Sequence, residues 1–229
     1  MRIRFALPLL AAALAGCSML PDSAEPYRST GVAPGPSPVG ALPAPRSEAA
    51  GQCLSRLGQM GADYAALPDR YADQGCTNLD TVQLAALSAD QSTLGVTNLG
   101  PVTCEVSQVF AAWARFGADR AARQILGSGL QSIETFGSYS CRNVAGTNRR
   151  SGHATGAAID ISGFVLEDGR RIMVKSGWNG GTAPEREFLR VVQQSACRRF
   201  ATVLGPDYNS AHNDHLHLEG VIGTKSYCR

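Results

Sequence analysis

The sequence predicts an α+β fold in which a small antiparallel sheet has flanking helices. Apolar residues recur at helical spacing in two separate regions, and short apolar runs of strand length lie between and after them. The expected order is helices, strands, a helix and a final strand, without the regular alternation that builds a parallel sheet. With 229 residues, the chain is long enough for one folded domain with appended segments.

The first residues have the pattern of an export signal. Arg2 and Arg4 precede a mostly apolar run at residues 5–15, which is too short to span a bilayer that needs about 20 residues. The sequence Leu-Ala-Gly-Cys that ends at Cys17 resembles a bacterial lipobox. We therefore expect residues 1–16 to be a lipoprotein signal peptide and Cys17 to be lipidated. An ordinary signal peptide followed by an incidental cysteine is the alternative.

Residues 17–48 are dominated by proline, glycine, alanine and serine, so a semi-extended tether is expected there, followed by the folded domain at 49–229. Ser18, rather than an aspartate, follows the cysteine, and in a double-membrane bacterium the resemblance to lipoproteins then implies the outer membrane rather than the inner membrane. The expected location is the bacterial cell envelope on the periplasmic side, with the membrane contacted through the lipid anchor only. The net charge of +2 falls close to zero once the signal is removed, so no nucleic-acid partner is expected.

Cysteine usage indicates an oxidising compartment. Of seven cysteines, six remain when Cys17 is assigned to the lipid. An even number in an exported chain indicates three disulfides, and the six lack the CxxC spacing of zinc ribbons. The favoured pairing follows sequence order: Cys53–Cys76, Cys104–Cys141 and Cys197–Cys228.

Local patterns place the individual elements. In the first half, we expect a short helix at Cys53–Met60, strands near 82–84 and 94–96, a helix capped by Thr103 that reaches Trp113, and a helical piece at 118–126. In the second half, we expect strands at 130–141 and 157–166, a hairpin turn at Asp168-Gly169 with a partner strand at 171–175, a helix from Pro184 to Val203, and a last strand at 215–221.

All four histidines lie in two short stretches, and this clustering indicates a metal site. The stretch from Ser151 to Asp160 contains His153, and the stretch from His212 to His217 contains the other three. Asp160 lies in an apolar run, where a carboxylate is costly unless it is paired or bound to a cation. The alternative is that Asp160 is a salt-bridged core acid and that hydrogen bonds satisfy the histidines.

The first stretch must bend for its polar residues to meet. His153 and Asp160 are an odd number of positions apart, so in a flat strand they would face opposite sides. Glycines at positions 152 and 156 permit a bend between them.

The second stretch offers alternative ligands and a base. His215 and His217 share one face of a strand, and either could complete a His, Asp, His set. Such a set suits zinc and leaves a fourth position for water, whereas binding by both histidines would close the site. Asp214 supplies a carboxylate that could deprotonate the water.

These motifs resemble those of a known family. Ser-x-His-x-x-Gly-x-Ala-x-Asp at 151–160, followed by Asp-His-x-His at 214–217, resembles the zinc peptidase group of D-Ala-D-Ala carboxypeptidases, VanX-like dipeptidases and phage endolysin peptidases. The chain is more closely similar to the extensin-like C-terminal domain family, over most of Cys53–Cys228, with shared segments at 137–143, 163–169, 196–206 and 209–217.

The resemblance implies a D-Ala-D-Ala carboxypeptidase/hedgehog-like architecture, with Zn²⁺ as the cofactor. It also implies a role for each residue of the motifs. His153, Asp160 and His217 match the metal ligands, Asp214 the general base, His215 a donor to the developing oxyanion, and Arg142 a group that polarises the scissile carbonyl or holds a substrate carboxylate. Ser151 matches a serine that orients the turn or the substrate. No residue of the family motif matches His212, and we expect it at the rim of the site or behind the metal ligands.

The function expected from these residues is zinc-dependent hydrolysis of amide bonds in peptidoglycan peptides. Three alternatives remain open. The domain could hold zinc and bind peptidoglycan peptides without cutting them, it could be a structural envelope lipoprotein, or it could hydrolyse amides of another envelope polymer. Zinc content and peptidoglycan digestion discriminate between these possibilities.

Overall fold

The structure is a computed structural model, and it describes residues 47–229. The predicted signal peptide, the lipidated Cys17 and nearly all of the predicted tether lie outside the described residues. Within residues 47–229, none of the helices is long and apolar enough to cross a membrane.

The described chain contains four α-helices and several shorter helical turns. The helices are α1 (Glu48–Gln59), α2 (Cys104–Trp113), α3 (Val174–Gly180) and α4 (Ala183–Cys197), with π-helical turns η1 (Ala114–Asp119) and η2 (Ala122–Leu126), and 3-10 turns η3 (Gly152–Thr155) and η4 (Ser210–His212). The strands are β1 (Asp63–Ala66), β2 (Arg70–Asp73), β3 (Cys76–Asn78), β4 (Thr81–Ser88), β5 (Thr93–Thr97), β6 (Val102–Thr103), β7 (Leu130–Gly137), β8 (Ala158–Leu166), β9 (Arg171–Met173), β10 (Thr202–Leu204), β11 (Leu216–Glu219) and β12 (Tyr227–Cys228).

Side-chain caps fix where two of the helices begin. Ser47 caps α1, since its hydroxyl accepts a hydrogen bond from Ala50 N at 3.1 Å. Helix α4 begins with a capping box, in which the side chains of Thr182 and Glu185 each accept a hydrogen bond from the backbone N–H of the other. Pro184 occupies the first turn of α4, where its missing N–H costs nothing.

The main sheet is larger than expected and mixed. Its order is β1-β4-β5-β7-β8-β11-β10-β12, with β6 paired to β4 and β9 to β8. The α+β class with a sheet and flanking helices is confirmed. The prediction of a small antiparallel sheet is wrong, because the sheet has ten strands and because β5–β7 and β10–β12 are parallel pairs. The connection through α2, η1 and η2 crosses one face of the sheet and brings β7 back parallel to β5.

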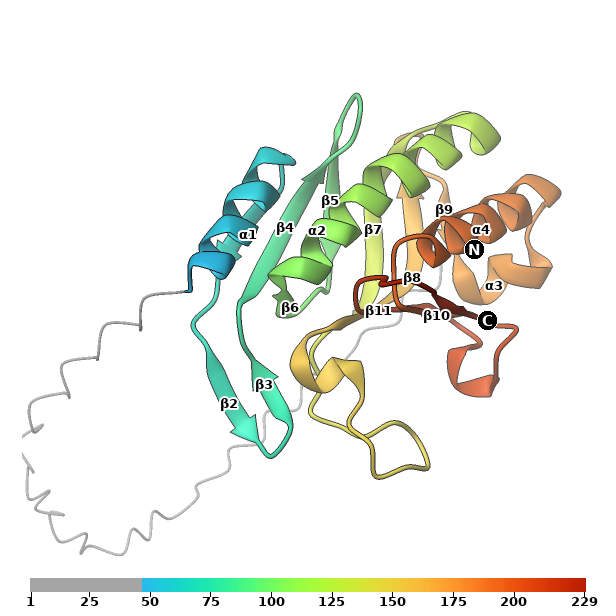
Figure 1. The fold of residues 1–229 in the computed structure, drawn as a ribbon. Helices are drawn as coiled ribbons and strands as arrows, with labels where there is room; N and C mark the ends of the chain where they lie inside the picture. Colours follow the sequence, from blue (N-terminus) through green and yellow to red (C-terminus); the bar gives the residue numbers. More distant parts are fainter. Residues whose placement is uncertain (1–46) are drawn as a thin grey trace, which may run out of the picture. The chain divides into compact units, whose positions relative to one another are not determined.

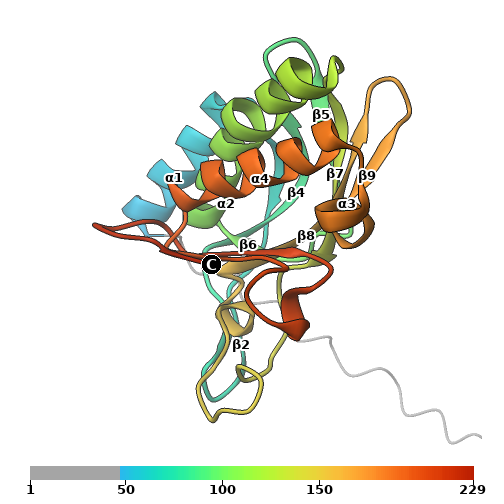
Figure 2. The ribbon, with the colours of Figure 1, turned by 90° about the vertical axis from the view of Figure 1, so that its right-hand side faces the viewer.

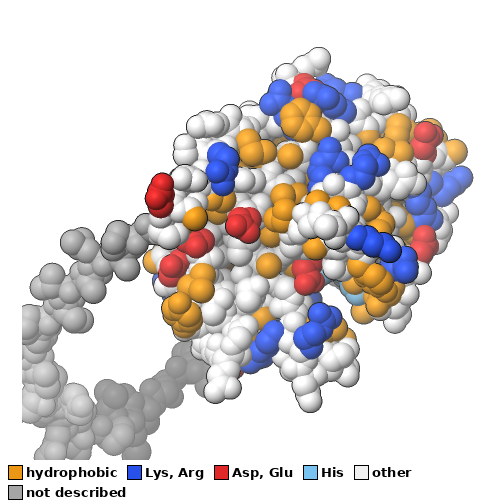
Figure 3. Space-filling model, viewed as in Figure 1, with side chains coloured by type: hydrophobic (Ala, Val, Ile, Leu, Met, Phe, Trp, Pro, Cys, Tyr) orange, Lys and Arg blue, Asp and Glu red, His pale blue; other side chains and the backbone are white. Residues whose placement is uncertain are grey.

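Helices α2 and α4 cover one face of the sheet, as the two views show (Figures 1 and 2). Trp113 of α2 is fully buried there and donates from Nε1 to the carbonyl oxygen of Val192 in α4 at 3.0 Å. Phe188 of α4 packs edge-on against Phe164 of β8, with ring centroids 5.0 Å apart. On the outer surface of this layer, positive and negative side chains are interspersed, and little histidine is visible (Figure 3).

Three predicted elements differ from the structure in the C-terminal part of the chain. The partner strand expected at 171–175 ends at Met173 as β9, because α3 begins at Val174. Helix α4 ends at Cys197, and Val203 lies in β10 rather than in the helix. Phe200 and Val203 are still fully buried, so the apolar spacing predicted the core correctly and the helix length wrongly. The last predicted strand is present as β11, but β12 follows it and pairs with β10.

The disulfides join Cys53 to Cys104, Cys76 to Cys141 and Cys197 to Cys228. The predicted pairings Cys53–Cys76 and Cys104–Cys141 are therefore wrong, and only Cys197–Cys228 is confirmed. The reason is tertiary packing, because α1 lies beside α2, and β3 belongs to a separate hairpin with β2. That hairpin extends below the body in the same direction as the loop that follows β7 (Figures 1 and 2).

Candidate metal centre

The bend expected between His153 and Asp160 is present. The turn η3 starts after Ser151, whose hydroxyl accepts a hydrogen bond from His153 N at 3.4 Å. It ends at Gly156, which has φ +65° in the left-handed region that favours glycine. Strand β8 begins two residues later, so the imidazole of His153 lies back over the carboxylate of Asp160.

Strand pairing brings the third residue to the same place. In the antiparallel pair β8–β11, His217 lies directly opposite Asp160, which makes their side chains neighbours on one face of the sheet. The flanking pairs Leu216–Ile161 and Leu218–Ile159 are fully buried. Because side chains alternate along a strand, these apolar pairs belong to one face and the polar pair to the other.

The three side chains form a compact group. Nδ1 of His217 lies 2.9 Å from Oδ1 of Asp160, Nε2 of His153 lies 3.2 Å from Oδ2 of Asp160, and the two nitrogens are 3.2 Å apart. One potential ligand atom from each residue falls within 4.8 Å of the others. His153 is 2% exposed and His217 is 6% exposed, so the group is shielded from solvent.

The outward-facing nitrogen of each histidine is also anchored. Nδ1–H of His153 donates to the carbonyl oxygen of Ser138 at 2.5 Å. Nε2–H of His217 donates to Oε2 of Glu219 at 2.9 Å. Anchors of this kind fix the orientation of a metal-binding imidazole and leave its other nitrogen free to coordinate. Two such nitrogens and a carboxylate then face one point, which is a donor set that fits a divalent cation.

Glu219 was not predicted from the sequence, although a signal for it exists. It lies two residues after His217 in β11, so both side chains occur on the same face of the strand. Gly152 makes room for it, because a Cβ at position 152 would lie 2.5 Å from Cδ of Glu219. Gly152 therefore allows the Glu219 side chain to approach the backbone closely, whereas Gly156 provides the bend.

The charged groups of the candidate centre perturb the pKa values of one another strongly. Burial disfavours the charged form of His217, but hydrogen bonds to Asp160 and Glu219 outweigh it and raise the pKa of His217 to about 9. Burial likewise raises the pKa of Asp160, but hydrogen bonds and charge interactions with His153 and His217 outweigh it and hold the pKa well below its usual range. The hydrogen bond from His217 lowers the pKa of Glu219.

The structure distinguishes His215 from His217. His215 precedes β11, and its Nε2 lies 3.5 Å from Oδ1 of Asp160, outside the three-residue group. Its Nδ1–H donates to Oδ1 of Asp214 at 2.9 Å. His215 and Asp214 therefore form a pair beside the candidate ligands, and Phe136 packs edge-on against the His215 ring with centroids 6.0 Å apart.

His212, in η4, lies against two of the other three histidines, with ring centroids 5.2 Å from His215 and 5.8 Å from His217. Its Nδ1 is 2.7 Å from Oδ1 of Asn209. The pKa of His212 is lowered to about 4, mainly because the ring is buried and also because His215 and His217 lie nearby. A neutral imidazole therefore lines the site at this position.

The last two predicted site residues lie on one loop. Ser151 is buried, and its role in the structure is to cap η3. Its backbone N–H donates to the carbonyl oxygen of Arg142 at 3.1 Å. Arg142 is exposed, and its charge lies near enough to help lower the pKa of His212. Among the described residues, none forms a hydrogen bond or ion pair with its guanidinium.

The fold and the site together define an α+β domain with a buried His-Asp-His centre suited to a metal ion. The family described as extensin-like protein C-terminus matches residues 51–229, and the chain belongs to this family. Among curated proteins and among solved structures, none shows a significant match to the chain.

Proposed function

We propose that this protein is a zinc-dependent hydrolase that cleaves amide bonds in peptidoglycan peptides, anchored by lipid on the periplasmic side of the bacterial outer membrane. The observation that carries the proposal is the three-residue donor set of His153, Asp160 and His217, with Asp214 and His215 immediately beside it. Three protein ligands leave room for water, which is the arrangement of catalytic rather than structural zinc sites. The architecture shared with D-Ala-D-Ala carboxypeptidases is part of the same proposal.

His153, Asp160 and His217 would hold the zinc ion, with Ser138 and Glu219 fixing the two imidazoles. Zinc in such a site lowers the pKa of a bound water towards ~7 and polarises a carbonyl group.

Asp214 and His215 provide the proton transfer and the support for developing charge. One carboxylate oxygen of Asp214 is bonded to His215, and the other has no hydrogen-bond partner among the described residues. That second oxygen can accept a proton from the attacking water and return it to the leaving amine nitrogen. His215 directs Nε2 towards the ligand group, where a protonated ring can donate to an oxyanion. Arg142 would polarise the carbonyl or hold a carboxylate of the substrate.

One observation favours a second function, that of a zinc-containing domain that binds peptidoglycan peptides without cutting them. Asp214 already accepts a hydrogen bond from His215, so one of its two carboxylate oxygens is occupied. In that function the same residues would hold the peptide.

Digestion of peptidoglycan by the purified full chain tests the proposal. Zinc content is measured first, and amines newly released from peptidoglycan are then identified by mass spectrometry. Asp214→Ala should retain zinc and lose about 10²–10⁴-fold in rate, which is the contribution of a positioned general base. His153→Ala should lose both zinc and activity. Asp63→Ala is the matched control, because Asp63 is an exposed carboxylate on β1, remote in sequence from the site.

Each outcome selects one function. Unchanged turnover in Asp214→Ala would remove the base assignment. Zinc binding together with peptide binding but no release of amines would establish the second function. A chain that carries no zinc and gains no thermal stability from it would refute both.

A further inference from the structure

Aromatic rings form a connected series that includes two of the histidines beside the candidate centre. The ring of His212 lies 5.2 Å from that of His215, measured between centroids. Phe136 meets His215 edge-on at 6.0 Å, and Tyr208 meets His212 edge-on at 5.5 Å. Tyr227 meets Tyr208 edge-on at 6.2 Å and is the last member. We call these five residues the aromatic series.

Three members of the aromatic series are exposed to solvent. Phe136 is 55% exposed, Tyr227 46% and Tyr208 40%. Residues 47–229 contain six exposed large hydrophobic side chains, and three of them belong to this series. Exposed apolar groups that gather in one place mark a binding surface, whereas scattered ones need no explanation. Because edge-on contact leaves at least one ring of each pair with both faces outside the contact, ring faces are available to a ligand.

The residues that follow Tyr208 offer hydrogen bonds without charge. Asn209, Ser210 and Asn213 are exposed. Oδ1 of Asn209 is 2.7 Å from Nδ1 of His212, and within residues 47–229 the amide N–H groups of Asn209 have no acceptor. Among the residues that the structure describes, the side chains of Ser210 and Asn213 likewise have no hydrogen-bond partner. A neutral ligand with many hydroxyl groups can use these donors and acceptors, whereas an apolar side chain cannot.

The fold holds Tyr208 in place. Its backbone N–H donates to the carbonyl oxygen of Gly205 at 2.9 Å. The carboxylate of the preceding residue, Asp207, accepts hydrogen bonds from Nε1 of Trp178 and from Nη1 of Arg190, each at 2.9 Å. A segment that is already positioned loses little conformational entropy when a ligand binds, so more of the contact energy appears as affinity.

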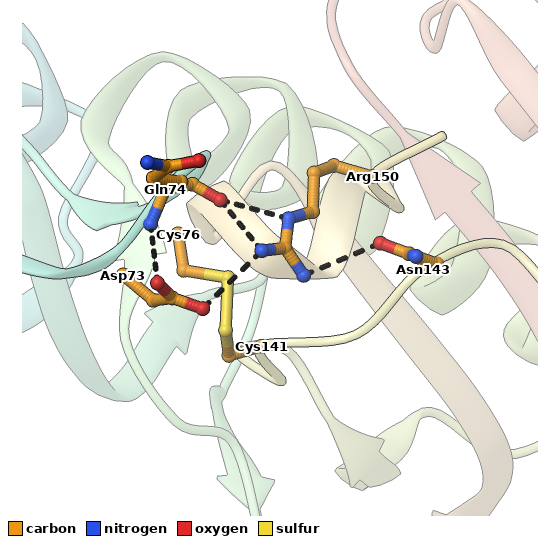
Figure 4. Close-up of a disulfide and its surroundings, with 6 residues drawn as sticks. All are labelled: Asp73, Gln74, Cys76, Cys141, Asn143 and Arg150. Carbon is orange, nitrogen blue, oxygen red and sulfur yellow. Dashed lines mark hydrogen bonds and ion pairs between the residues drawn. A yellow bond between two sulfur atoms is a disulfide. The ribbon is translucent and has the colours of Figure 1, made fainter. Parts of the chain in front are cut away.

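The fold also holds the Phe136 end of the aromatic series. Phe136 lies in β7, and the loop that follows this strand is fastened to the β2–β3 hairpin (Figure 4). The disulfide between Cys76 and Cys141 joins the loop to the hairpin. Arg150 adds two hydrogen bonds to the carbonyl oxygen of Gln74, from Nε at 2.9 Å and from Nη2 at 2.6 Å. Both ends of the series are therefore preorganised.

We propose that Phe136 and Tyr208 stack on the pyranose rings of a glycan, so that the substrate class is a peptide still joined to its sugar chain. A pyranose ring presents C–H groups on its faces, and these groups pack against the negative face of an aromatic ring. Its hydroxyl groups lie at the edges, where the amide and hydroxyl groups after Tyr208 can bond to them. This inference rests on the proposed hydrolase function for the peptide part of the substrate, but the binding of the sugar can be measured without turnover.

Binding is measured by calorimetry with the full chain, supplied with zinc, in an Asp214→Ala background. The probes are a peptidoglycan disaccharide-peptide and the free peptide of the same sequence. The disaccharide-peptide should bind about tenfold more tightly, which is the scale of one stacked aromatic contact. Tyr208→Ala should abolish this preference, and Phe136→Ala should reduce it.

Two substitutions at Tyr208 separate stacking from simple apolar contact. Tyr208→Phe keeps an aromatic face and should retain most of the preference, whereas Tyr208→Leu keeps apolar bulk without that face and should lose it. The control is Phe116→Ala, because Phe116 is 44% exposed in η1 and the guanidinium of Arg120 lies over its ring, outside the aromatic series. This control should leave the preference unchanged.

In the otherwise wild-type chain, Tyr208→Ala should raise the KM for the disaccharide-peptide about tenfold, since the lost contact is remote from the reacting bond. The inference is overturned if Tyr208→Ala, with an unchanged melting temperature, keeps the preference. It is also overturned if Tyr208→Ala weakens binding of the free peptide as much as that of the disaccharide-peptide, because the series would then bind peptide. Failure of the hydrolase function has a different signature, because no amide would be cleaved while the Tyr208-dependent preference in binding remained.

Discussion

Zinc binding should release a proton from His217 at neutral pH. In the metal-free protein, hydrogen bonds to Asp160 and Glu219 raise the pKa of His217 to about 9, so its imidazole is charged at pH 7. A zinc ion at Nδ1 must displace the proton that Nδ1 donates to Asp160. Because pH 7 lies about two units below that pKa, binding should release about one proton from His217, and the apparent affinity for zinc should rise about tenfold per pH unit up to pH 9.

The raised pKa of His217 also determines how the stability of the metal-free protein depends on pH. A pKa raised in the folded state contributes stability that is fully present below the unfolded value of 6.5 and is lost as the pH rises through about 9. A pKa shift of this size corresponds to about 3 kcal/mol in the free energy of unfolding. The melting temperature of the metal-free protein should therefore fall between pH 7 and pH 9.5, whereas the zinc-loaded protein should gain stability over the same range.

Calorimetric titration with zinc between pH 6.5 and pH 8.5, in buffers of different ionisation enthalpy, counts the protons released. Glu219→Gln is the matched variant, because it removes one of the two carboxylates that raise the pKa of His217. It should release fewer protons at pH 8.5 than the wild type. An affinity that stays flat from pH 7 to pH 8.5, with no proton released, would refute the assignment of His217 as a charged group displaced by the metal.

Two further predictions concern the support of the centre. Gly152→Ala places a Cβ 2.5 Å from Cδ of Glu219 and should weaken zinc binding about tenfold, which calorimetric titration measures. Gly51→Ala is the control, because a Cβ at this position on α1 meets open space, and it should leave the zinc affinity unchanged. Replacing both Cys76 and Cys141 with alanine should lower the free energy of unfolding by about 2–5 kcal/mol, which denaturant titration measures, and an unchanged midpoint would show that the bridge does not stabilise the fold.

Local patterns were sufficient to predict several elements. Alternation and turn residues predicted β7 and β8 and the hairpin turn at Asp168-Gly169, because these features depend on residues adjacent in sequence. Helical spacing predicted α2 and the start of α4. Helical spacing placed the end of α4 too late, because Phe200 and Val203 are buried at the same spacing although the helix ends at Cys197.

Long-range pairing could not be read from the same patterns. Sequence order suggested a Cys53–Cys76 bridge, but the packing of α1 beside α2 brings Cys53 to Cys104. The parallel pairing of β5 with β7 likewise depends on how the connection crosses the sheet. These are tertiary facts, and a single sequence does not contain a local signal for them.

The choice between His215 and His217 shows how register completes the centre. Both residues satisfy the period of a strand, so spacing alone leaves the ligand open. In the structure, the burial of Leu216 and Leu218 against β8 sets which residue of β11 faces Asp160, and that residue is His217. A slip of one residue would send His217 into the core and the leucines to the outer face. The hydrophobic pairs thus hold the candidate ligand in place, and His215, outside the strand, stays available to Asp214.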